Sequence, residues 1–118
     1  AGNVVSGLQF LTGKPPEDQA DLRAEVAALH AQVQQAIAAG EVADEGDAED
    51  VTDALAKTEA ELEKPEPNGK RAARKLEEAA EILTGAAEAA TAAGKVGRAV
   101  VKLAPVAMMV WKMAEALL

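Results

Sequence analysis

The fold is decided by the stretch ELEKPEPNGKRAARKLEEAAEIL, residues 61–83. Pro65, Pro67, Asn68 and Gly69 separate two runs of helix-forming residues in it. Each proline removes a backbone donor and moves the preceding residue away from helical geometry, so the first helix ends there. Asn68 is a preferred N-cap residue and predicts the start of the next helix. Because the connection is short, the two helices should be antiparallel neighbours.

Helical patterns continue on both sides of this corner. Upstream they predict helices over 16–39, ended by Gly40, and over 48–64, capped by Asp47. Downstream they predict helices over 69–93 and 96–117, and we expect Pro105 to kink the last helix or to lie in the first turn of a shorter one. The expected inner seams are Leu22, Val26, Leu29, Val33, Leu55, Leu62, Leu76 and Leu83. The sequence therefore predicts an all-α fold, an antiparallel bundle of about four helices.

The N-terminal part has a different pattern. Residues 3–12, NVVSGLQFLT, contain β-branched and aromatic residues without a helical stripe and predict a short extended or β segment. We therefore expect residues 1–14 to be an extended segment, the end of a preceding module or a linker, and residues 15–118 to be the helical bundle domain. The first residues lack the pattern of a signal peptide and the chain has no cysteine, so the expected location is cytoplasmic.

Composition and charge favour association over chemistry. Hydrophobic residues make up 49% of the 118 residues but aromatic residues only 2%, so a core of Ala, Leu and Val buries modest area. Residues 1–67 hold 4 Lys and Arg against 15 Asp and Glu, a net charge of −11; residues 68–118 hold 8 against 5, a net of +3. The total of −8 argues against nucleic acid as a partner.

The chain lacks a recognisable catalytic or metal-binding motif. The acidic stretch 44–53 has the wrong spacing for a calcium loop around Gly46, because the bidentate position falls on Thr52. His30 is the single histidine and lies beside the seam, so we expect it to be an exposed helix residue. The basic residues Lys70, Arg71, Arg74 and Lys75 predict a salt-bridged helix face. We therefore predict no catalytic, cofactor-binding or metal-binding residues and no enzyme activity.

The last helix is apolar on nearly every side, which is typical of a helix buried in a core or an assembly. Its uncharged run, 103–111 between Lys102 and Lys112, is much shorter than the ~20 residues that cross a bilayer, so a membrane contact is not expected. The predicted protein interface comprises Val106, Met108, Met109, Val110, Trp111, Met113 and Leu117. The predicted partner is a second copy of the chain, most simply in a two-fold dimer, or a neighbouring domain of the same protein.

The stretch ELEKPEPNGKRAARKLEEAAEILTGAAEAA and the apolar helix after it, about residues 48–118, resemble a family of C-terminal helical domains. These are oligomerisation or adaptor domains of bacterial multidomain signalling and conflict-system proteins, which carry NTPase, repeat or effector modules. The shared features are an EL-x-KPEP corner, a charged helix with a Leu/Ile seam and an Ala/Gly-rich apolar tail. The resemblance implies a role in oligomerisation or in coupling modules, and it implies no catalytic residue.

Two functions remain open at this point. The first is a non-catalytic self-association or adaptor domain that oligomerises or couples modules of a larger bacterial signalling or defence protein. The alternative is a membrane-acting effector tail that uses the apolar C-terminal helix.

Overall fold

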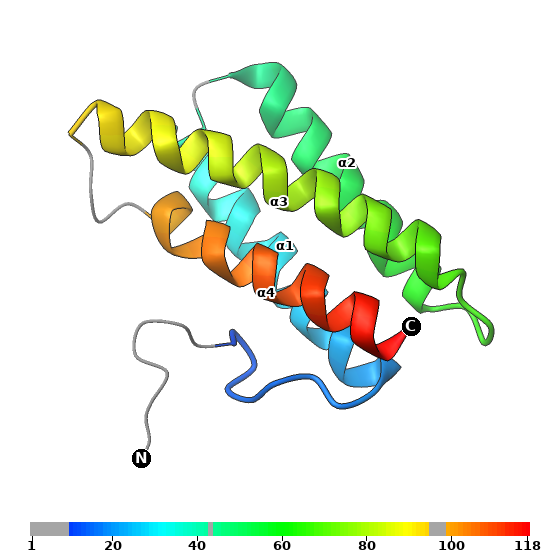
Figure 1. Cartoon of the computed structure of the whole chain (residues 1–118). Helices are drawn as coiled ribbons and strands as arrows, with labels where there is room; N and C mark the ends of the chain where they lie inside the picture. Colours follow the sequence, from blue (N-terminus) through cyan, green and yellow to red (C-terminus); the bar gives the residue numbers. More distant parts are fainter. Residues whose placement is uncertain (1–9, 43, 95–98) are drawn as a thin grey trace, which may run out of the picture.

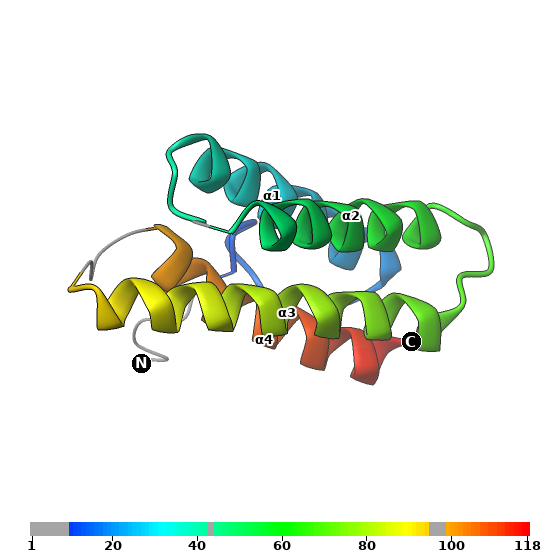
Figure 2. The same cartoon turned by 90° about the horizontal axis from the view of Figure 1, so that it is seen from above.

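The computed structural model describes residues 10–42, 44–94 and 99–118 of the chain. These residues form four helices, α1 (Gln19–Ala38), α2 (Glu45–Leu62), α3 (Gly69–Ala92) and α4 (Ala99–Leu117). The helices lie in two layers, with α1 beside α2 in one layer and α3 beside α4 in the other (Figures 1 and 2). The fold is the all-α helical bundle that the sequence predicts.

Each helix packs on two others. Contacts join α1 to α2, α2 to α3, α3 to α4 and α4 back to α1, so the core lies inside a closed ring of helices. The core is aliphatic, and its largest fully buried apolar side chains are Leu22, Leu29, Leu55, Leu62, Leu76, Leu83, Val26, Val33, Val51, Val100 and Val110. All eight predicted seam residues are therefore buried, which confirms the period read from the sequence.

The helix ends follow local capping chemistry, with two corrections to the predicted starts. α1 begins after Asp18, whose Oδ1 accepts from the Asp21 amide at 2.8 Å, and not at residue 16. α2 begins after Asp44, whose Oδ1 accepts from the Asp47 amide at 3.0 Å, so Asp44 and not Asp47 is the cap. Aspartate favours the N-cap position wherever it stands, so the sequence alone does not choose between Asp44 and Asp47.

The predicted stop after α1 is confirmed. Gly40 has a φ of 77°, its amide donates to the Ile37 carbonyl, and the Glu41 amide donates to the Ala36 carbonyl at 2.9 Å. This pair of bonds is a Schellman motif, which requires a left-handed residue and so favours glycine. The Glu41 side chain then reaches α4, where its Oε1 accepts from the Val100 amide at 3.1 Å. The loop after α1 therefore caps the first turn of α4.

Pro105 lies inside α4, so the alternative of a shorter final helix that begins near Pro105 is wrong. α4 is described from Ala99, and residues 96–98 of the predicted helix lie outside the described residues. The helix ends beside the start of α3 (Figure 2). A Cβ atom at Gly69 would lie 2.7 Å from the Leu118 Cβ, so the missing side chain of Gly69 permits this approach.

The segment before α1 contains neither helix nor strand over the described residues 10–18. Residues 1–9 of the predicted extended segment lie outside the described residues. The described part is held to α1 through Glu25, which is completely buried and accepts hydrogen bonds from Leu11 and Thr12. Residues 10–14 thus contact the bundle itself.

Candidate functional site

The predicted interface residues of α4 fall into three environments. Val106 and Val110 are 7% and 0% exposed and belong to the core of the bundle. Met109, Trp111, Met113 and Leu117 are half-buried. Met108 is 37% exposed and is one of the few large apolar side chains on the described surface. The last helix therefore has a distinct inner side, which the all-round apolar sequence does not reveal.

The outward side of α4 forms an open apolar groove with α3. The groove has a volume of about 640 Å³ and is lined by Thr84, Ala87, Glu88, Thr91, Ala92, Val101, Ala104, Pro105 and Met108. We call this surface the α3–α4 groove. Val101, Ala104, Pro105 and Met108 are spaced by 3, 1 and 3 residues, so they share one side of a helix. Sequence reasoning included only Met108, although this spacing is visible in the sequence.

The alanine-rich end of α3 supplies the opposite wall. Ala90 is 7% exposed and packs in the core, whereas Ala87 is half-buried and Ala92 is exposed. Because these side chains are small, the α3 wall is low and the Met108 side chain stands at the rim of the groove. An apolar helix of a partner could pack against this shallow surface.

Trp111 lies in a different hollow, at the other end of the α3–α4 pair. That hollow is polar and is lined in part by Lys70, Arg74, Glu77 and Glu115. The Lys112 Nζ lies 4.7 Å from the centre of the Trp111 ring, within the range of a cation–π contact. Trp111 is thus separated from the apolar groove by about one turn of α4, and its surroundings are charged.

The corner between α2 and α3 is built around a buried carboxylate. Glu61 is 5% exposed, and its Oε2 accepts from the Asn68 amide at 2.8 Å. Its Oε1 lies 3.2 Å from the Lys64 Nζ and 3.7 Å from an Arg71 guanidinium nitrogen. The Asn68 side chain accepts from the Arg71 amide at 3.0 Å, which confirms the predicted cap. The hydrogen bond from Asn68, aided by Lys64 and Arg71, outweighs desolvation and lowers the pKa of Glu61 below the usual 4.5.

This pKa shift predicts a loss of stability in acid. Since the pKa is lower in the folded chain, the contribution of Glu61 is complete above pH 4.5 and is lost as the pH falls through the folded value. We expect the melting temperature of the wild type to exceed that of Glu61→Gln at pH 7, and the difference to shrink below pH 4.5. Glu66→Gln, at an exposed position of the same corner, is the reference. A difference that grows on acidification would contradict the assignment.

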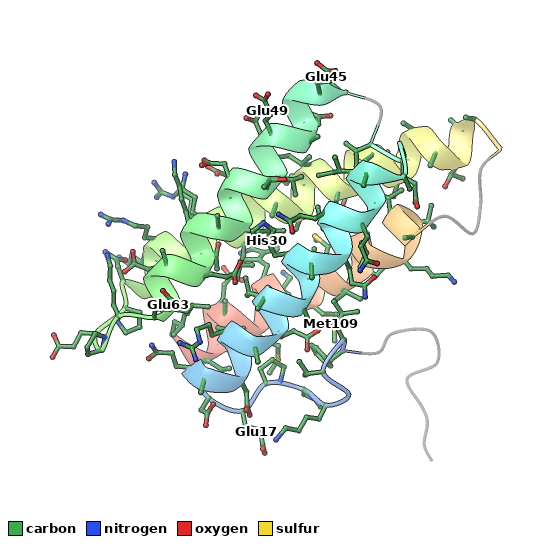
Figure 3. All side chains as sticks on the ribbon, turned by 180° about the vertical axis from the view of Figure 1, so that it is seen from behind. Glu17, His30, Glu45, Glu49, Glu63 and Met109 are labelled. Atoms are coloured by element: carbon green, nitrogen blue, oxygen red, sulfur yellow. The ribbon has the colours of Figure 1, made fainter. Side chains whose placement is uncertain are left out.

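His30 is not the exposed residue that the sequence predicts. Its side chain is 18% exposed, and its Nδ1 lies 2.5 Å from the Glu59 Oε2 of α2. Figure 3 shows His30 between α1 and α2. The Nε2 atom is buried and has no hydrogen-bond partner within the described residues. The histidine therefore joins two helices, and none of the described pockets opens onto it.

The acidic start of α2 faces solvent. Glu45 and Glu49 project away from the bundle (Figure 3). Among the described residues, no group of three or more His, Asp or Glu side chains is arranged to hold a metal ion. Nor does any helix of the described part combine the length and apolar character needed to cross a bilayer.

Comparisons with known proteins found no match for this chain. No family model matches it, and neither do any curated protein or solved structure. Of the four hollows described, the α3–α4 groove has the most apolar lining, so it is the candidate site.

Proposed function

We propose that this chain is a non-catalytic self-association or adaptor domain, which oligomerises or couples modules of a larger bacterial signalling or defence protein. The observation that carries the proposal is the α3–α4 groove, where Val101, Pro105 and Met108 form an apolar stripe along the outside of α4. The resemblance of residues 48–118 to C-terminal adaptor domains supports the setting in a larger protein.

The favoured occupant of the groove is a second copy of the chain. In a two-fold pair, α4 of one copy lies antiparallel to α4 of the other, and the same stripe serves both sides of the contact. Pro105 of one copy then lies opposite Met108 of its partner when the axis passes between these two positions. Met108 can adapt its shape to the shallow alanine wall of α3, because its side chain is long and unbranched.

Charge distribution favours this face for pairing. Most acidic residues of the chain belong to the N-terminal part that forms α1 and α2, which carries the net charge of −11 over residues 1–67. These helices lie in the other layer of the bundle (Figure 2). Among the residues that line the groove, Glu88 is the single charged one. Pairing through α3 and α4 thus keeps the two acidic layers apart, whereas pairing through α1 and α2 brings like charges together.

The test is the mass of the protein in solution by light scattering. We expect a wild-type dimer at high micromolar concentration. We expect Met108→Glu to weaken the dimer at least about tenfold, because it places a charge in an apolar contact. The matched control is Ala116→Glu, which places the same charge at an exposed position of the same helix outside the groove.

Helical content by circular dichroism should be the same in the wild type and both variants. A wild type that stays monomeric at high micromolar concentration would refute self-association. A Met108→Glu variant that dimerises as tightly as the wild type would place the contact on another surface.

A further inference from the structure

We infer that residues 10–14 form a releasable strap, which is latched to α1 by the carboxylate of Glu25. This strap rests on residues different from those of the α3–α4 groove and does not depend on the proposed self-association. The strap runs along the side of the bundle where α1 and α4 are neighbours (Figures 1 and 2).

The latch is a single carboxylate, and both of its oxygens accept hydrogen bonds from the strap. The Leu11 amide donates to the Glu25 Oε2 at 2.6 Å. The Thr12 amide donates to the Oε1 at 3.0 Å, and the Thr12 hydroxyl donates to the same atom at 2.7 Å. Glu25 is 0% exposed, and no Lys or Arg of the described residues forms an ion pair with it. A buried carboxylate needs such donors, so strap and latch depend on each other.

A turn in the strap presents its donors. The Gly13 amide donates to the Phe10 carbonyl at 3.0 Å, and Gly13 has a φ of 93°, which favours glycine. The two residues inside this turn are Leu11 and Thr12, whose amides both reach Glu25. Successive backbone amides of a turn form a natural cradle for an anion. The contact therefore depends on the backbone of the strap and on the identity of residue 25.

Apolar burial holds only one end of the strap in place. Phe10 is half-buried, whereas Leu11 is 36% exposed and Thr12, Gly13 and Lys14 are also exposed. When the strap leaves, water can hydrate the carboxylate and the released amides. The hydrogen bonds between strap and carboxylate are then replaced by hydrogen bonds to water. Such a contact opens more readily than the aliphatic core. The strap is thus a switch between a closed state, in which Glu25 is buried, and an open state, in which α1 presents a free carboxylate.

The experiment measures amide hydrogen exchange by NMR in the full chain. In the wild type, the Leu11 and Thr12 amides should exchange more slowly than in an unstructured peptide. Glu25→Gln should accelerate both by at least about tenfold, because a neutral amide is a weaker acceptor and turns a donor toward the strap. Amides in the middle of α3 should exchange as before. The matched control is Glu81→Gln, at an exposed glutamate of α3 outside the α3–α4 groove, which should leave the strap unchanged.

A second variant removes a donor and keeps the latch residue. Leu11→Pro deletes the amide that reaches the Glu25 Oε2 and occupies the second position of the turn, which proline favours. It should accelerate exchange of the Thr12 amide at least about tenfold, without an effect on α3. The inference is overturned if the wild-type Leu11 and Thr12 amides exchange at unprotected rates. It is also overturned if Thr12 stays protected in Leu11→Pro, or if both amides stay protected in a folded Glu25→Gln.

Discussion

Leu76→Ala is expected to lower the free energy of unfolding by about 2–5 kcal/mol. Leu76 is 0% exposed and lies on α3, which contacts both α2 and α4. The largest fully buried apolar side chains are leucine and valine, so each leucine supplies a large share of the buried area. Since small domains have only about 5–15 kcal/mol of stability, this change is a large fraction of the total.

Urea unfolding followed by circular dichroism measures this effect. Met108→Ala is the control, because Met108 is 37% exposed and its truncation should change the free energy of unfolding of the monomer by about 0.5 kcal/mol or less. The measurement should be made at a concentration at which the chain is monomeric, so that association does not contribute. Equal losses in the two variants would mean that α3 does not have the central position described above.

Enlarging a buried alanine of the same helix should also destabilise the bundle. Ala79 is 0% exposed in α3, where a small side chain lets the neighbouring helices approach closely. Ala79→Leu adds three carbon atoms to this contact and should cost about 1–3 kcal/mol, because close-packed interiors resist added volume. The variant tests whether the alanine content of the chain reflects tight helix packing or only helix propensity.

The control is Ala31→Leu, at an exposed position in the middle of α1. Both substitutions exchange residues of similar helix propensity, so Ala31→Leu should change the free energy of unfolding by about 0.5 kcal/mol or less. The difference between the two melting temperatures reports the packing term alone. An Ala79→Leu variant as stable as Ala31→Leu would show that the interfaces of α3 can accommodate a larger side chain.

The approximate bounds of the helices could be predicted because they depend on local chemistry. Asn68 caps α3 as expected, and Gly40 ends α1, since capping needs side-chain oxygens or a left-handed residue at one position. The buried seam of Leu22, Val26 and Leu29 follows from helical periodicity. The start of α2 was misplaced by three residues because Asp44 and Asp47 are equally good caps in the sequence.

The candidate surface was only partly predictable. Val106 and Val110 belong to the core while Met108 lies outside, yet all three are apolar members of one helix. A helix that is apolar on every side carries no directional signal, so the positions of α1 and α3 decide which side is covered. The spacing that puts Val101, Pro105 and Met108 on one side of the helix is visible in the sequence, but the position of α3 decides that this side lines a groove.

The sequence by itself determined that the chain forms helices, where most of them end and which stripe of α1, α2 and α3 is buried. Only the tertiary structure decided the partners of Glu25, His30, Glu41 and Glu61. The Glu41 carboxylate meets the amide of a residue 59 positions later, and His30 meets a glutamate 29 positions later. Helix periodicity and capping act over a few neighbouring residues, whereas these contacts exist only once the helices have packed and brought distant residues together.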